Sequence, residues 1–125
     1  MPPKNRVLVV DDDDGIRTAV ADALDFEGYE VITATNGVEA LDRVRTARPN
    51  VVVLDLMMPV MDGWAFIEKC RTDELCDGTP VLVMSAYRHL ATTAPCLGAN
   101  ACIATKPFDL DVLLGAVERL VQRAA

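Results

Sequence analysis

The sequence alternates five times between a short apolar run and a stretch with helical periodicity. Many residues of the apolar runs are valine or isoleucine, which favour buried strands. The stretches between them repeat apolar residues three and four positions apart, as one face of a helix does. This alternation predicts a parallel sheet with right-handed crossovers and helices on both faces. We expect strands at 6–10, 29–34, 51–54, 80–84 and 102–104, and helices at 15–27, 36–48, 62–70, 88–97 and 109–123.

Five βα units are too few to close an eight-stranded barrel, so the sheet is expected to be open and doubly wound. The length of 125 residues suits one domain, and we assign residues 1–125 to a single α/β domain with a (βα)5 fold. The helix at 88–97 has the weakest pattern, because Pro95 removes a backbone donor and clashes with the preceding turn. In such a sheet the functional site lies at the carboxyl ends of the strands.

The chain carries a net charge of −7 at pH 7. Direct nucleic-acid binding is therefore not expected, since phosphate contacts need a basic face. The apolar runs are too short to span a bilayer, and the N-terminal MPPKNR lacks the apolar core of a signal peptide. These features predict a cytoplasmic protein with no membrane partner.

The four cysteines contain no Cys-x-x-Cys pair, and the single histidine, His89, forms no zinc-binding spacing with them. A zinc site is therefore not expected. Structural disulfides are rare in the cytosol, so we expect buried, reduced thiols instead. The cysteines are Cys70, Cys76, Cys96 and Cys102.

Polar side chains stand where four of the five predicted strands end. Asp11 and Asp12 follow the first strand, Asp55 follows the third, Ser85 follows the fourth, and Lys106 comes just after the fifth. Because parallel strands share a direction, these residues lie at one edge of the sheet. If the first and third strands are neighbours, their ends are about 5 Å apart and three carboxylates converge on one small volume.

Three carboxylates in such a volume repel one another unless a cation compensates them. Mg²⁺ suits them, because it prefers oxygen ligands and commonly binds one or two carboxylates plus a phosphate. Lys106 and Ser85 add a cation and a hydroxyl opposite the acids, which favours a phosphoryl group there. A simpler interpretation stays open, in which Asp11 and Asp12 cap a helix and Asp55 fills a loop.

Asp13 and Asp14 have a different expected role. They stand immediately before or within the first turn of the helix at 15–27, where the positive end of the helix dipole favours acids. We therefore expect Asp14 to cap this helix rather than to take part in chemistry.

Four segments, in order, resemble the receiver domain of response regulators in two-component signalling. The resemblance covers essentially the whole chain and implies a CheY-like, flavodoxin-like fold with strand order 2-1-3-4-5. The segments are VLVVDDDDGIR at 7–17, VVVLDLMMPVMDGW at 51–64, PVLVMSA at 80–86 and TKPF at 105–108.

The resemblance implies that Asp55 accepts a phosphoryl group from the phosphohistidine of a histidine kinase. It also implies that Asp12 is the main direct ligand of Mg²⁺ and that Asp11 helps through a water molecule. The backbone carbonyl of Met57 would complete the protein ligands beside Asp55.

Further roles follow from the same resemblance. Lys106 would pair first with the acceptor carboxylate and then with the phosphoryl oxygens, and its bond to Pro107 would be cis. Ser85 would turn its hydroxyl toward the phosphoryl group and draw the following loop inward. Pro59 and Gly63 would shape the loop beside the acceptor.

The implied partners are a sensor histidine kinase or phosphotransfer protein and a downstream protein target. The protein would be a monomer or weak dimer that catalyses its own phosphorylation and slow dephosphorylation. The face built from the fourth helix, the fifth strand and the fifth helix would change on phosphorylation. We see no output domain after the last predicted helix, so the chain either works alone or is an excised domain.

The sequence departs from the family pattern near the fifth strand. The family usually has Tyr or Phe there, whereas Cys102 and Ile103 are not aromatic, and the segment 98–106 is one residue longer than usual. Tyr87 either replaces the missing aromatic residue or only covers the fourth helix. Met57 and Tyr87 are also expected to flank the path of the hydrolytic water and to slow its attack.

Two other functions compete with this interpretation. VVDDDDG also fits the strand-then-DxD pattern of haloacid-dehalogenase-type phosphatases, with Asp11 as nucleophile and Asp13 as general acid. That interpretation leaves Asp55 without a role, and the chain is too short to hold a cap domain. The second alternative is a receiver-like binding module that is never phosphorylated.

Overall fold

The structure is a computed structural model, and it describes residues 5–55, 58, 60–73, 79–85, 101–105 and 110–124. The strands are β1 (Arg6–Val10), β2 (Glu30–Ala34), β3 (Val51–Asp55), β4 (Val81–Ser85) and β5 (Ala101–Thr105). The helices are α1 (Asp14–Phe26), α2 (Gly37–Ala47), α3 (Gly63–Thr72) and α5 (Leu110–Ala124). None of these described helices is long and apolar enough to cross a membrane.

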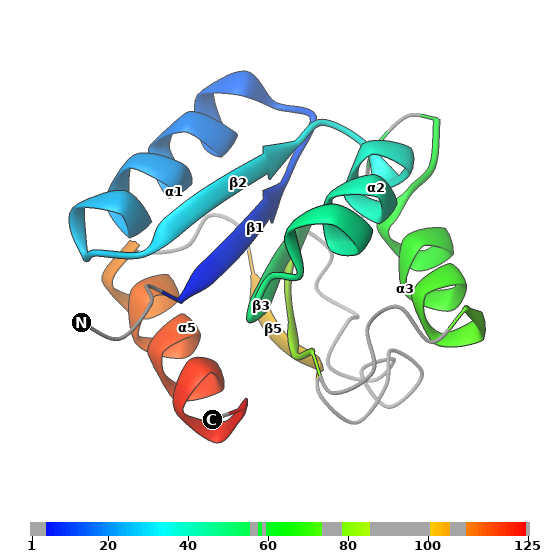
Figure 1. Cartoon of the computed structure of the whole chain (residues 1–125). Helices are drawn as coiled ribbons and strands as arrows, with labels where there is room; N and C mark the ends of the chain where they lie inside the picture. Colours follow the sequence, from blue (N-terminus) through cyan, green and yellow to red (C-terminus); the bar gives the residue numbers. More distant parts are fainter. Residues whose placement is uncertain are drawn as a thin grey trace.

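The strands form one parallel sheet in the order β2-β1-β3-β4-β5. The predicted α/β class and parallel sheet are confirmed, and the strand order agrees with the order that the resemblance implies. The helix predicted at 88–97 lies outside the described residues, so the complete (βα)5 alternation stays a prediction. Figure 1 shows the sheet in the middle of the molecule, with α1 and α5 on one side and α2 and α3 on the other.

Two apolar clusters, one on each face of the sheet, hold these layers together. Successive side chains of a strand point to opposite faces, so Leu8 and Val10 pack toward α2 and α3 while Val7 and Val9 pack toward α1 and α5. Every residue of β3 is buried. The continuous apolar runs of the sequence therefore reflect strands that are covered on both faces.

Short polar side chains fix where the helices begin. Asp13 accepts a hydrogen bond from the amide of Ile16 at 2.9 Å and is the N-cap of α1. Asp14 is instead the first helical residue and pairs with Arg17, so the expectation that Asp14 is the cap was wrong by one position. Both residues lie at the start of the helix, as predicted. Asp13 is the cap because its backbone has the extended conformation that an N-cap requires.

The expectation that the cysteines are reduced was wrong for Cys70. Its buried side chain packs in the cluster beneath α2 and α3, and it is disulfide-bonded. The prediction of reduced thiols rested on the redox state of the cytosol, whereas a disulfide depends on whether two sulfur atoms lie within bonding distance. The side chains of the other three cysteines lie outside the described part of the chain.

Candidate functional site

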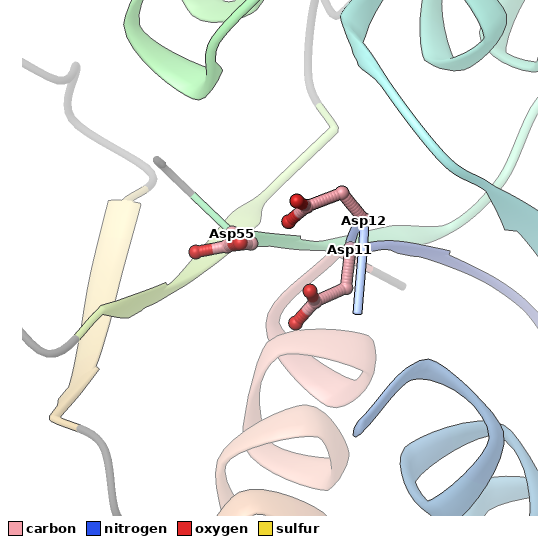
Figure 2. A group of neighbouring side chains, drawn as sticks. All are labelled: Asp11, Asp12 and Asp55. Atoms are coloured by element: carbon pink, nitrogen blue, oxygen red, sulfur yellow. The ribbon is translucent and has the colours of Figure 1, made fainter. Parts of the chain in front are cut away.

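Three aspartates meet at the carboxyl ends of β1 and β3. Asp11 and Asp12 directly follow β1, and Asp55 is the last residue of β3. The two strands are neighbours, and their register pairs Val10 with Leu54. Each of the three carboxylates places an oxygen within 4.8 Å of the others. Figure 2 shows the three side chains together at the ends of the two strands. The predicted convergence of the acids is confirmed.

The three acids differ in their exposure to solvent. Asp11 is 0% exposed and Asp55 is 4% exposed, and they are the two buried charged groups in the described part of the chain. Asp12 is exposed. Buried carboxylates close to one another raise the free energy of the folded state unless positive charge compensates them. The site therefore has two buried acids and an open side at Asp12 from which a ligand can enter.

Asp11 is fixed through its backbone and its side chain. Its amide donates to the carbonyl of Ala34 at 3.2 Å, and its carboxylate accepts from the amide of Asp13 at 2.9 Å. Its carbonyl accepts from Arg17 Nη1 at 2.9 Å, and the same guanidinium pairs with Asp14. These contacts tie β1, β2 and the start of α1 together at the site. Arg17 was not among the predicted site residues, although its spacing of three from Asp14 on a helix was a usable signal.

The connection from β2 to α2 carries a related hydrogen-bond pair. The hydroxyl of Thr35 donates to Glu39 at 2.6 Å, and the amide of Thr35 donates to the same carboxylate at 3.3 Å. These hydrogen bonds hold the pKa of Glu39 below its usual value. Asn36 is the N-cap of α2, and its side chain accepts a hydrogen bond from the amide of Glu39 at 2.9 Å.

The other predicted site residues are only partly described. Ser85 ends β4, next to the register pair of Asp55 and Met84, so its backbone lies at the same edge of the sheet as the acids. The side chain of Ser85 lies outside the described part of the structure. Lys106 follows the last residue of β5, but Lys106 itself, Met57 and Tyr87 lie outside the described residues. Pro59 and Pro107 lie outside them as well.

Asp13 bears on the phosphatase alternative. Its carboxylate accepts the amide hydrogen of Ile16 as the cap of α1. A general acid must instead present its oxygen to a leaving group within hydrogen-bond reach. The geometry thus favours a structural role for Asp13.

The receiver-domain family model matches residues 7–118. The chain belongs to the response regulator receiver family. Response regulator MprA of Mycobacterium sp. (strain KMS) is 41% identical over 122 residues, which cover 96% of the chain and 52% of MprA. Regulatory protein AtoC of Escherichia coli (strain K12) is 39% identical over 119 residues, covering 94% of the chain and 25% of AtoC. The receiver therefore spans about half the length of the first relative and a quarter of the second.

Solved structures agree with this assignment. The chemotaxis response regulator CheY4 of Vibrio cholerae superposes with a TM-score of 0.85 and 34% identity, over 94% of this chain and 99% of that one. The receiver domain of the Francisella response regulator 1452 gives a TM-score of 0.88 and 31% identity, over 98% and 100% of the two chains. The protein is thus a CheY-like receiver domain of two-component signalling. Response regulators receive signals from histidine kinases, and receiver domains generally bind Mg²⁺ in an acidic pocket.

Proposed function

We propose that this receiver accepts a phosphoryl group on Asp55 from the phosphohistidine of a sensor histidine kinase or phosphotransfer protein, in a reaction that needs Mg²⁺. The observation that carries the proposal is a buried carboxylate at the end of β3 with two further carboxylates within 4.8 Å. Family membership supports the same reaction. Residues 1–125 would form one receiver unit that acts in the cytoplasm, as a monomer or weak dimer.

The donor set fits Mg²⁺. The cluster offers carboxylate oxygens only, which are the ligands that this hard cation prefers. Asp11 and Asp12 would hold the ion together with Asp55 and the carbonyl of Met57. Bound Mg²⁺ would supply positive charge that offsets the charge on the phosphoryl oxygens.

The other steps of phosphoryl transfer would depend on side chains of the protein. An oxygen of Asp55 forms a bond to phosphorus while the bond from phosphorus to the donor nitrogen breaks. The rigid end of β3 holds that oxygen in line, which lowers the entropic part of the barrier. We assign Lys106 to the phosphoryl oxygens and Ser85 to the hydroxyl contact that turns the face of β5 and α5 toward a downstream protein.

Phosphorylation by a small donor tests the acceptor residue. Wild-type protein is incubated with acetyl phosphate and Mg²⁺, and the intact mass is measured. We expect one acid-labile phosphoryl adduct on the wild type and none on Asp55→Asn. Asp22→Asn, an exposed position on α1, is the matched control and should be phosphorylated normally. An adduct on Asp55→Asn would refute the acceptor assignment, and no adduct on the wild type would favour the unphosphorylated binding module.

A further inference from the structure

The loop between β3 and α3 is anchored to the core on both sides of Val60. Met58 is 9% exposed and belongs to the cluster beneath α2 and α3, and Met61 packs against the same cluster. Val60 lies between them, is 84% exposed and has φ +71°. A β-branched residue rarely adopts this left-handed backbone. The packing of the two methionines therefore imposes a loop conformation that Val60 itself disfavours.

Gly37, the first residue of α2, lies directly against Met61 of this loop. Its amide donates to the carbonyl of Met61 at 3.0 Å. A Cβ atom on Gly37 would lie 2.5 Å from Cγ, 2.7 Å from the backbone oxygen and 2.8 Å from Cβ of Met61. A new rotamer of Met61 could move Cγ away, but it could not move Cβ or the backbone oxygen. Any side chain at position 37 must therefore displace the loop or the start of α2.

Position 37 requires glycine because Met61 lies so close to it, and not because of its backbone conformation. Gly28 is the glycine among the described residues with a left-handed backbone, at φ +98°, and a Cβ there would meet nothing within 4 Å. A Cβ on Gly115 in α5 would also meet nothing within 4 Å. The two positions thus supply controls in which the same substitution leaves the loop untouched.

We infer that Gly37 is a positioning residue for phosphoryl transfer. Met61 packs against the buried cluster that contains Leu54, the residue directly before Asp55, so displacing Met61 disturbs the packing that holds the acceptor. The amide of Gly37 sets the distance between α2 and this loop, and thereby the alignment of the acceptor carboxylate. The inference rests on the proposed function of Asp55.

The experiment compares three alanine variants at saturating acetyl phosphate and Mg²⁺, at a temperature where circular dichroism shows each to be folded. Gly37→Ala should slow phosphorylation by about tenfold or more, because a misplacement of ~1 Å can reduce a rate about 100-fold. Gly28→Ala strains the turn at the opposite edge of the sheet, so it should lower stability but keep the wild-type rate. Gly115→Ala should keep both.

A wild-type rate in Gly37→Ala would overturn the inference, and so would an equal slowing in Gly28→Ala at equal loss of stability. No adduct on the wild-type protein would refute the proposed function as well, which separates the two failures. If Gly37→Ala yields too little folded protein, the same variants are compared in a Val60→Gly background. Glycine adopts φ +71° without strain, so this background stabilises the loop, and the tenfold difference between its Gly37→Ala and Gly28→Ala forms should remain.

Discussion

Replacing Asp55 by asparagine should stabilise the fold in the absence of divalent cations. The change keeps the size of the side chain and removes one of three clustered charges. At 4.8 Å, the largest separation within the cluster, and an effective dielectric constant of ~20, two carboxylate charges repel by about 3.5 kcal/mol. Solvent at Asp12 screens part of the repulsion, and the variant also loses whatever interactions of Asp55 depend on its charge. We therefore expect a net gain of about 1–2 kcal/mol in the free energy of unfolding.

Urea unfolding followed by circular dichroism measures this gain. In EDTA, Asp55→Asn should unfold at a higher urea concentration than the wild type, with the same slope m. In Mg²⁺ the gap should narrow or reverse, because the wild-type site binds the ion more tightly than the variant. Asp22→Asn removes an equal charge from an exposed site and should change neither curve. A variant that is less stable than the wild type in EDTA would refute the idea that the acids repel one another in the folded protein.

Three further predictions test single residues. At an Mg²⁺ concentration of roughly 100 times Kd, the ion should add about 2.7 kcal/mol to the free energy of unfolding and so raise the melting temperature of the wild type. Asp12→Ala should lose most of this gain, and a response equal to that of the wild type would contradict the assignment of Asp12 as a ligand. Val60→Gly should stabilise the protein by about 0.5–1 kcal/mol in urea unfolding, since glycine relieves the left-handed strain and the exposed side chain contributes no packing. Because the hydrogen bonds from Thr35 depress the pKa of Glu39, its ionised form stabilises the fold above its ordinary pKa of 4.5, and this contribution is lost as the pH falls through the lower folded value. As the pH is lowered below 4.5, the free energy of unfolding should therefore fall less in Glu39→Gln than in the wild type. An equally steep fall in both proteins would show that Glu39 does not contribute.

The strands could be predicted closely because their pattern has a single physical cause. A strand segment covered on both faces must be apolar at every position, and residues 7–10, 51–54 and 81–84 of β1, β3 and β4 are such runs. The predicted third strand ended at 54 and the observed one ends at Asp55, since a charged residue breaks the apolar pattern but still completes the ladder. The start of α1 was displaced by one residue for a similar reason. Four consecutive aspartates all suit a cap, and only the backbone conformation selects one.

The acid cluster followed from the sequence because parallel strands bring their ends together. The contact between Gly37 and Met61 did not follow, because it joins the start of α2 to the loop before α3, and their separation depends on how deeply the two helices pack. The spacing of apolar residues in the sequence does not indicate the distance between these two segments. The strained φ of Val60 was missed for the same reason, since the sequence does not show that Met58 and Met61 both turn inward. The disulfide of Cys70 also depends on a distance that composition does not encode.

The burial of β1 and β3 explains why the acid cluster persists in the folded chain. Val10 and Leu54, which pair just before the acids, are fully buried in the cluster beneath α2 and α3. Separating the two strands to relieve repulsion would expose this cluster to water, at about 25 cal/mol for each Å² of apolar surface. The repulsion therefore cannot be relieved by moving the backbone and must be relieved by charge. A cation bound at the exposed side of Asp12, as proposed above, would add to that charge, so the packing that holds the strands together also favours the ligand.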